Sequence, residues 1–370
     1  MVADLLDDFV LYRSLNPVNA ELPRFADIAA DLGLPLVPVP RKCDTTYGHV
    51  VARLLNAANR LRGSTEPIQR ILLIGDTMFN DGHAFTSIAR AGSWPGAAFI
   101  GCDDVASPTL SVEAVDEARN IFRSNRWSAI ADFEAHCETL GLSIDDQTAV
   151  VFDLDKTLLG ARGRNDQAID NVRIAAARRT AQQLLGDDYD VPVFEAAYRT
   201  LNRPEFHEFT TDNQDIIVYL CLVVSAGALT RDQLGDWLRS HPSARFGRFL
   251  DWIDPRKESF PAPLQSEHER VIEAVANGDP TPLKAFRRNE FRETVSRLGG
   301  NEESDGRQPD LSTEIFLTEE VLEVGMTWRD RGALLFGLSD KPDEACLPGG
   351  GGADSTLPPL HRIAGRVLGM

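Results

Sequence analysis

The sequence contains little that would cross-link the chain or bind a soft metal. Its five cysteines lie far apart, at positions 43, 102, 137, 221 and 346, and no two of them form a CxxC pair. The seven histidines are equally scattered. Structural zinc sites need closely spaced cysteine and histidine ligands, and disulfide frameworks need several cysteines in a short chain. Neither kind of site is expected here.

Basic residues are scarce relative to acidic ones, with 38 Lys and Arg against 56 Asp and Glu and a formal net charge of −18. Such a chain is repelled by nucleic acids and by anionic membranes, so neither is expected as a partner. No segment approaches the roughly 20 apolar residues of a membrane span. The first residues, Met1 to Asp4, lack the charged-then-apolar pattern of a signal peptide. We therefore expect a cytoplasmic protein, and the sequence indicates no oligomeric state.

The most informative segment is an apolar run that ends in two carboxylates. Residues 150 to 159 read Val-Val-Phe-Asp-Leu-Asp-Lys-Thr-Leu-Leu. Because side chains at i and i+2 share one face of an extended strand, Asp153 and Asp155 are expected to converge just past the strand. Ligands of open parallel α/β sheets bind at this edge, where paired carboxylates can hold Mg²⁺ and supply a nucleophile and an acid/base.

The pattern of Asp153, Asp155 and Thr157 resembles the first motif (DxDxT) of the haloacid dehalogenase (HAD) superfamily, most of whose members are phosphatases. In that family a strand ending in Ser or Thr follows, then a Lys, then an acidic GDxxxD or GDxxxxD motif. Here the acidic motif comes first: the apolar run 71–74 leads into Gly75, Asp76 and Asp81. This unit resembles the family's fourth motif.

The other two motifs of the family also have counterparts. A predicted buried strand ending at Ser339 resembles the second motif. Lys42, before a helix that leads to the 71–74 strand, matches the third-motif lysine, with Arg41 or Lys341 as substitutes. The order third, fourth, first, second indicates a circularly permuted core, which is feasible because domain termini often lie close together. Alternatively, residues 1 to about 145 are the tail of a lost upstream copy, and the chain carries two half-domains.

The expected fold is α/β: a doubly wound parallel-sheet, Rossmann-like HAD core with permuted motif order and an inserted helical cap. We expect residues 1–165 to form the first part of the core, 166–317 the cap and 318–370 the second part of the core. Helix and strand signals alternate up to about residue 160, and helical spacing dominates from about 173 to 298. Near the N-terminus we expect helices at Asp4–Tyr12 and Leu22–Leu32 and a short strand at Leu36–Val39.

The resemblance implies a role for each motif residue. Asp153 would be the nucleophile, and Asp155 the general acid and base. Lys42 and Ser339 would bind the phosphoryl group, helped by backbone N–H groups at a helix start after Ser339. Mg²⁺ would be the cofactor, with ligands from Asp153, Asp76, Asp81 and the backbone carbonyl of Asp155; Asn80 could share the role of Asp81.

Contacts to the rest of the substrate are less specified. Thr157 of the first motif and Arg162 and Arg164 of the following loop are candidates, although a solvated turn is the simpler interpretation of the two arginines. The most basic segment is Lys284 to Arg288 in the expected cap. It would be either a substrate contact or a solvated helix face.

The resemblance implies an enzyme, a Mg²⁺-dependent phosphoric monoester hydrolase acting on a small phosphorylated metabolite such as a sugar phosphate through an aspartyl-phosphate. The presence of Asp155 disfavours dehalogenation and phosphonate hydrolysis, since the acid/base carboxylate is kept. A phosphomutase of the same superfamily keeps both carboxylates and stays an alternative. A non-catalytic module that binds a phosphorylated ligand is the other alternative.

Overall fold

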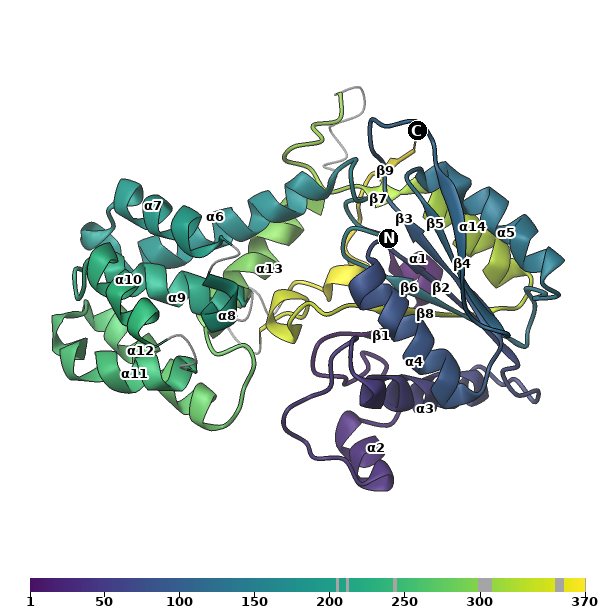
Figure 1. Ribbon diagram of the computed structural model, residues 1–370, viewed down its shortest axis with the longest axis horizontal. Helices are drawn as coiled ribbons and strands as arrows, with labels where there is room; N and C mark the ends of the chain where they lie inside the picture. The colour runs from purple at the N-terminus through teal and green to yellow at the C-terminus, as the bar shows by residue number, and fades with distance from the viewer. Residues whose placement is uncertain (204–205, 211–212, 242–244, 299–307, 350–355, 370) are drawn as a thin grey trace. The chain divides into compact units, whose positions relative to one another are not determined.

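The chain forms two compact units in the computed structural model, which describes residues 1–203, 206–210, 213–241, 245–298, 308–349 and 356–369 (Figure 1). The first unit contains Met1–Asn171 and Thr294–Met370, and the second contains Val172–Glu293. The second unit is thus inserted, in sequence, between the two parts of the first.

The first unit is built on a seven-stranded sheet. Its order is β1 (Val10–Leu11), β8 (Leu334–Leu338), β6 (Thr148–Asp153), β2 (Arg70–Gly75), β3 (Gly96–Gly101), β5 (Arg119–Ser124) and β4 (Leu110–Asp116). All neighbouring strands are parallel except β4 and β5, which pair antiparallel. The α/β class with a mostly parallel, Rossmann-like sheet is therefore confirmed, whereas the edge hairpin was not anticipated.

Helices cover both faces of this sheet (Figure 1). On one face, α3 (Thr45–Leu61) and α4 (His83–Gly92) share a core with Val151 of β6. On the other face are α5 (Ile130–Thr139) and α14 (Glu319–Asp330), where the ring of Trp328 lies 6.4 Å from that of Phe152. The alternation of Val151 and Phe152 follows the two-residue period of a strand, and both are fully buried because helices pack on both sides.

One glycine sets the distance between α3 and α4. A Cβ atom on Gly48 would lie 2.3 Å from the backbone carbonyl carbon of Ser87 in α4. The two helices can approach this closely only because position 48 has no side chain. This contact fixes the start of α3, which follows Lys42.

The N-terminal segment differs from the sequence-based expectation. The helix expected over Asp4–Tyr12 ends early: α1 is Ala3–Leu6, and Val10 and Leu11 form β1, in register with Gly337 and Leu338 of β8. The second expected helix is present as α2 (Phe25–Leu32). The strand expected at Leu36–Val39 is wrong, because Leu36 and Val37 are 54% and 52% exposed and have no core to face.

The described part of the second unit is helical, as expected for this stretch. Its helices are α6 (Asp166–Leu185, shared with the first unit), α7 (Val191–Leu201), α8 (His207–Thr210), α9 (Gln214–Ser225), α10 (Arg231–Ser240), α11 (Phe246–Ile253), α12 (Ala262–Ala276) and α13 (Lys284–Leu298, also shared). Every residue of α9 from Asp215 to Val224 is buried. A helix that is apolar on all sides must lie inside its unit, so α9 is the central helix of this unit.

The boundaries of the inserted unit are narrower than the expected 166–317. Residues from Thr294 onward belong to the first unit. There β7 (Leu317–Thr318) pairs with β9 (Val367–Leu368), and the Asn165 side chain donates to the carbonyls of Leu311 and Glu314. These contacts are made across long stretches of sequence, so helical periodicity alone could not locate the boundary.

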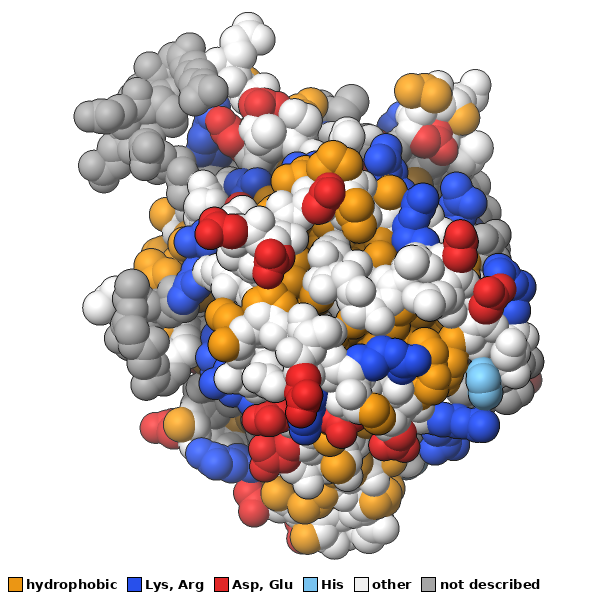
Figure 2. Space-filling model, turned by 90° about the vertical axis from the view of Figure 1, so that its left-hand side faces the viewer, with side chains coloured by type: hydrophobic (Ala, Val, Ile, Leu, Met, Phe, Trp, Pro, Cys, Tyr) orange, Lys and Arg blue, Asp and Glu red, His pale blue; other side chains and the backbone are white. Residues whose placement is uncertain are grey.

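The charges on the surface are mixed. Figure 2 shows one face of the molecule, on which Lys and Arg side chains are interspersed with Asp and Glu side chains. Among the described residues, no helix combines the length and the apolar character needed to cross a membrane.

Candidate functional site

Three neighbouring strands end at the same edge of the sheet and bring the predicted motifs together. Phe152 of β6 is in register with Ile74 of β2 on one side and with Gly337 of β8 on the other. Asp153 is the last residue of β6, and Asp76 directly follows β2. The carboxyl ends of parallel strands are where open α/β sheets bind ligands, so this edge is the candidate site.

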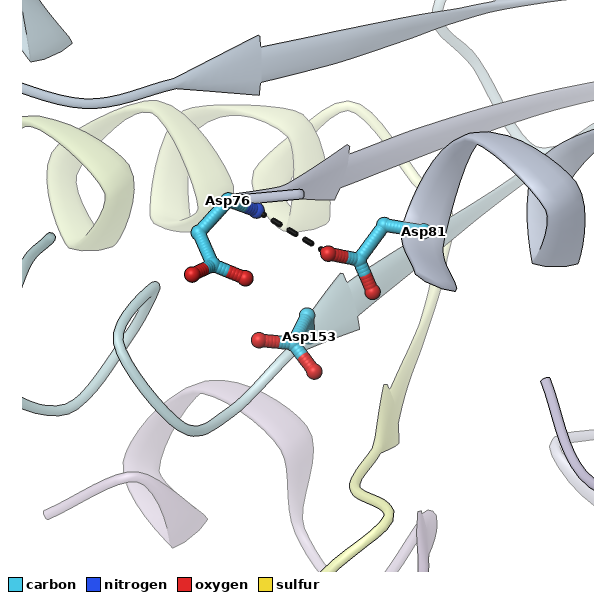
Figure 3. A group of neighbouring side chains, drawn as sticks. All are labelled: Asp76, Asp81 and Asp153. Atoms are coloured by element: carbon cyan, nitrogen blue, oxygen red, sulfur yellow. Dashed lines mark hydrogen bonds between the residues drawn. The ribbon is translucent and has the colours of Figure 1, made fainter. Parts of the chain in front are cut away.

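Three carboxylates meet at this edge. Asp76, Asp81 and Asp153 each offer one oxygen, and these oxygens lie within 4.8 Å of one another (Figure 3). Asp81 and Asp153 are buried, and Asp76 is partly buried. An all-oxygen, anionic donor set of this kind suits a hard divalent cation such as Mg²⁺.

Asp81 is held by the turn that follows β2. A π-helical turn, Met78–Gly82, precedes α4, and Asp81 Oδ2 accepts hydrogen bonds from the backbone N–H groups of Asp76 (3.1 Å) and Thr77 (2.9 Å) and from the Thr77 hydroxyl (3.1 Å). A Cβ on Gly75 would lie 2.5 Å from the Asp81 Cβ, so the glycine lets Asp81 pack against the strand end. These contacts hold the Asp81 carboxylate against the turn that carries Asp76.

Lys42 lies between two of the carboxylates. Its ammonium donates to Asp81 Oδ1 at 2.8 Å and to Asp153 Oδ1 at 2.5 Å, and the residue is 3% exposed. The lysine comes from the turn before α3, where the Arg41 N–H donates to the Asp44 side chain. The structure thus brings Lys42, and not Arg41, to the cluster.

Thr157 orients the other oxygen of Asp153. Its hydroxyl donates to Asp153 Oδ2 at 3.0 Å, and its side chain is fully buried. The chain reaches this position through Lys156, whose φ of 64° is in the left-handed region. Thr157 thus contacts Asp153 directly, and its contact with a substrate stays a prediction.

The electrostatics of the cluster reflect crowded negative charge. Burial raises the pKa of Asp153 well above its usual range, and Lys42 only partly opposes this. Burial and the neighbouring charge of Asp81 raise the pKa of Asp76 to about 7, against the effect of Arg162. Burial also disfavours ionised Asp81, but Lys42 and the Thr77 N–H lower its pKa below the usual value. For Lys42, the two carboxylates outweigh burial and raise the pKa well above its usual range.

Asp155 and Ser339 lie beside a second lysine. Lys341 Nζ is 3.9 Å from Asp155 Oδ1, and the backbone N–H of Lys341 donates to Ser339 Oγ at 3.0 Å. Asp155 is outside the group of three carboxylates that share the cation-sized space. The helix expected after Ser339 is only a three-residue turn, Asp343–Ala345, so the helix is wrong, whereas the phosphate contact of Ser339 and the N–H groups after it stays a prediction.

The two loop arginines have different surroundings. Arg162 donates to Asp76 Oδ2 at 2.9 Å, and its side chain is 43% exposed, so it lies at the cluster and reaches solvent. The Arg164 guanidinium is buried and is bound by Asp103, by Glu320 in two hydrogen bonds and by the Leu368 carbonyl. Because its three nitrogens are used inside the protein, we replace the expected substrate contact of Arg164 by a structural role.

The basic segment Lys284 to Arg288 is not a uniform solvated face. Arg287 is buried and bonded to Asp215 and Glu290, whereas Arg288 is exposed. Arg287 therefore belongs to the interior of the second unit.

Comparison of the chain with protein-family models, with curated proteins and with solved structures finds no match.

The residue that sequence reasoning assigned least well is Lys341, which appeared only as a substitute for Lys42. Ser339 and Lys341 are two residues apart, as Asp153 and Asp155 are. The same i, i+2 argument that placed the two carboxylates together would have placed Lys341 on the side of Ser339.

Proposed function

We propose that this chain is a Mg²⁺-dependent phosphatase that hydrolyses a small phosphate monoester through an aspartyl-phosphate. The observation that carries the proposal is the environment of Asp153. Its two oxygens accept from Lys42 and Thr157, and it lies at a strand end beside Asp76 and Asp81. A carboxylate held by a cation, next to a site for a divalent ion, is the arrangement needed for attack on a phosphorus atom.

The donor set fits Mg²⁺. Three carboxylates face two cations, Lys42 and Arg162, so the cluster keeps an excess of negative charge in a mostly buried place. Asp76 and Asp153 would hold the ion together with the Asp155 carbonyl, and Asp81 would be a further acidic ligand, directly or through water. When bound, Mg²⁺ neutralises charge on the phosphoryl oxygens and orients them.

The side chains of the chain then divide the reaction between them. An Asp153 oxygen forms a bond to phosphorus while the bond to the ester oxygen breaks, and Asp155 gives its proton to the departing alcohol. Asp155, now a carboxylate, takes a proton from a water molecule that attacks the phosphorus. This step releases inorganic phosphate and restores both carboxyl groups. Lys42 stays beside Asp153 and balances the charge that builds up on the transferring group.

The permuted HAD-type core is part of the same proposal. Three features support it. The acidic, DxD and Ser strands are adjacent in the sheet although their chain order is unusual, and the N-terminal β1 continues the sheet beside β8. The helical second unit is inserted between β6 and β8, as a cap between the first and second motifs would be. In a circular permutation the chain is opened at a different loop of the same fold, and the residues of the site keep their positions in space.

The proposal is tested by phosphate release from para-nitrophenyl phosphate and from a panel of sugar, nucleotide and amino-acid phosphates, with Mg²⁺ and with EDTA. Asp153→Asn keeps the size of the side chain but removes the nucleophile, and kcat should fall by at least about 1,000-fold. Asp145→Asn is the matched control. It lies before the other end of β6, bonded to Arg70, and should keep activity within about twofold.

Activity that survives in Asp153→Asn would rule out the proposed nucleophile. Activity unaffected by EDTA would rule out the metal. If label from a phosphorylated substrate is recovered on a second position of the same molecule without release of phosphate, the chain is a mutase. If phosphorylated compounds bind but none is turned over, it is a binding module.

A further inference from the structure

The two lysines of the site serve different carboxylates. Lys42 contacts the proposed nucleophile, Asp153, and Lys341 lies near the proposed acid, Asp155. In the proposed reaction Asp153 faces the phosphorus atom, whereas Asp155 faces the ester oxygen and the alcohol attached to it. Lys341 is therefore on the side of the leaving group.

The backbone of Lys341 is fixed on both sides. Its N–H donates to Ser339 Oγ at 3.0 Å, and its carbonyl accepts from the Arg13 N–H at 3.1 Å. Ser339 is itself tied to β1 through its own N–H, which donates to the Leu11 carbonyl at 2.9 Å. A lysine on such a fixed turn presents its ammonium at a defined place, which is what a specificity contact requires.

The ammonium is buried beside Asp155. The Lys341 side chain is 3% exposed, and Nζ lies 3.4 Å from Thr294 Oγ1 and 3.9 Å from Asp155 Oδ1. An ester oxygen in hydrogen-bond contact with Asp155 would be at most about 7 Å from Nζ. A group a few bonds further along the alcohol would reach the ammonium.

We propose that Lys341 binds an anionic group on the alcohol part of the substrate, so that the preferred substrates are phosphate monoesters with a second negative charge. This inference rests on the proposed phosphatase function and extends it to a substrate class. A buried ammonium repels a cationic alcohol, gains little from a neutral one and pairs with a carboxylate or a second phosphate. Lysine suits either anion because its ammonium acts as a point charge.

Three phosphate esters on a two-carbon skeleton test the charge preference: phosphoglycolate (anionic), ethyl phosphate (neutral) and phosphoethanolamine (cationic). The wild type should give kcat/KM values in that order, with the anion favoured over the neutral ester about 10- to 100-fold. Fructose 1,6-bisphosphate against fructose 6-phosphate distinguishes a phosphate from a carboxylate as the second anion. In Lys341→Met the preference for the anionic member of each pair should disappear, and Lys341→Arg should restore part of it.

Lys257→Met is the control, because Lys257 pairs with Asp254 in the second unit. It should leave the anion-to-neutral ratio unchanged. A Lys341→Met enzyme in which both rates fall by the same factor would overturn the inference, since the lysine would then support the site without contacting the alcohol. A wild type with no charge preference would overturn it as well.

Binding measured without turnover separates this inference from the proposed function. In an Asp153→Asn background, calorimetry should show phosphoglycolate binding more tightly than ethyl phosphate, and the added Lys341→Met change should remove the difference. That result would support the charge preference even if no ester is hydrolysed, in which case only the phosphatase function fails. Equal binding of the two esters in Asp153→Asn would overturn the inference, whatever the activity of the wild type.

Discussion

Each unit of the chain buries a cluster of charged side chains, and the two clusters are balanced differently. In the second unit, Arg287 donates to Asp215 at 2.7 Å and to Glu290 at 2.7 Å, and Arg173 lies 3.7 Å from Glu290. Two carboxylates there face two guanidinium groups. In the first unit, three carboxylates, Asp76, Asp81 and Asp153, face Lys42 and Arg162.

If the proposed function is right, this difference in charge balance separates a structural cluster from a functional one. Burial raises the pKa of Asp215, which Arg287 and the Leu283 N–H partly oppose, and the carboxylates and guanidinium groups of this cluster are equal in number. The cluster at the strand ends has one carboxylate more than it has cations. It lies at the edge where sheets of this kind bind ligands. We interpret the first as an interior ion network and the second as a site completed by a cation from outside.

The comparison predicts that removing Arg287, the cation that contacts both carboxylates of the cluster in the second unit, is strongly destabilising. Arg287→Met leaves Asp215 and Glu290 buried without it, and the free energy of unfolding of the second unit should fall by about 3–5 kcal/mol. Denaturant titration measures the loss. Arg288→Met is the matched control, because Arg288 is the next residue on α13 and is exposed; its effect should stay within about 0.5 kcal/mol.

A second substitution identifies the cause of that loss. If unpaired buried charge is responsible, the double variant Arg287→Met/Asp215→Asn should be more stable than Arg287→Met alone. A further loss in the double variant would instead mean that the hydrogen bond from the Leu283 N–H to Asp215 matters more than the charge.

Mg²⁺ should stabilise the first unit by binding to the cluster of Asp76, Asp81 and Asp153. Binding to the folded state alone raises the free energy of unfolding by about 2.7 kcal/mol when the free ion is 100 times its dissociation constant. Asp76→Asn should remove most of this stabilisation. Asp104→Asn, a change at an exposed carboxylate after β3, should leave it intact. The measurement is thermal unfolding across a Mg²⁺ series, with Ca²⁺ and NaCl at equal ionic strength as comparisons.

Without Mg²⁺, Asp76→Asn should stabilise the protein, whereas Arg287→Met should destabilise it. Asn at position 76 removes one of three crowded carboxylates, so the metal-free protein should gain about 1 kcal/mol of stability. A loss of stability in metal-free Asp76→Asn would mean that the Arg162 ion pair outweighs the repulsion, and the contrast between the clusters would fail.

Sequence reasoning located the strands of the site well, because each is an apolar run that ends in a polar motif. Asp153, Asp76 and Ser339 all lie at or directly after the end of a predicted strand. The sheet order was not available from periodicity, since the two-residue period of a strand does not say which strand is its neighbour. Lys42 was placed by its spacing from the acidic motif, and its contact with Asp153 exists only in the folded chain.

Arginine roles were harder to predict for the same reason. Arg162 and Arg164 are two residues apart in one loop and look equivalent in the sequence. The partner of Arg164, Glu320, is 156 residues away, whereas Arg162 turns to Asp76. The edge hairpin was missed because β4 is largely exposed and so lacks the buried pattern that reveals the other strands.

The two units also share one arrangement, which gives the smallest of the expected effects. In each, a buried histidine contacts a tyrosine hydroxyl through Nδ1 and an aspartate through Nε2: Tyr12, His361 and Asp8 in the first, and Tyr219, His268 and Asp254 in the second. Burial lowers the pKa of both histidines below the usual value, and the aspartates only partly oppose this.

The lowered pKa fixes the sign of the pH effect. The unfolded chain binds a proton near the usual histidine pKa of about 6.5, whereas the folded chain binds it only at lower pH. Stability is therefore complete above that value and falls as the pH drops below it, by at most about 1.4 kcal/mol per pH unit for each histidine. The lowered pKa values of Asp8 and Asp254 act separately, below the usual aspartate value of 3.8.

Denaturant titrations between pH 5 and 8 measure this slope. Asp76, whose pKa is raised to about 7, also titrates in this range, so the contribution of each histidine is the difference between the wild type and its variant. His361→Gln and His268→Gln should each reduce the slope, and His83→Gln, at an exposed position, should leave it unchanged. If His361→Gln and His268→Gln keep the slope of the wild type, the lowered pKa values of the two histidines are contradicted.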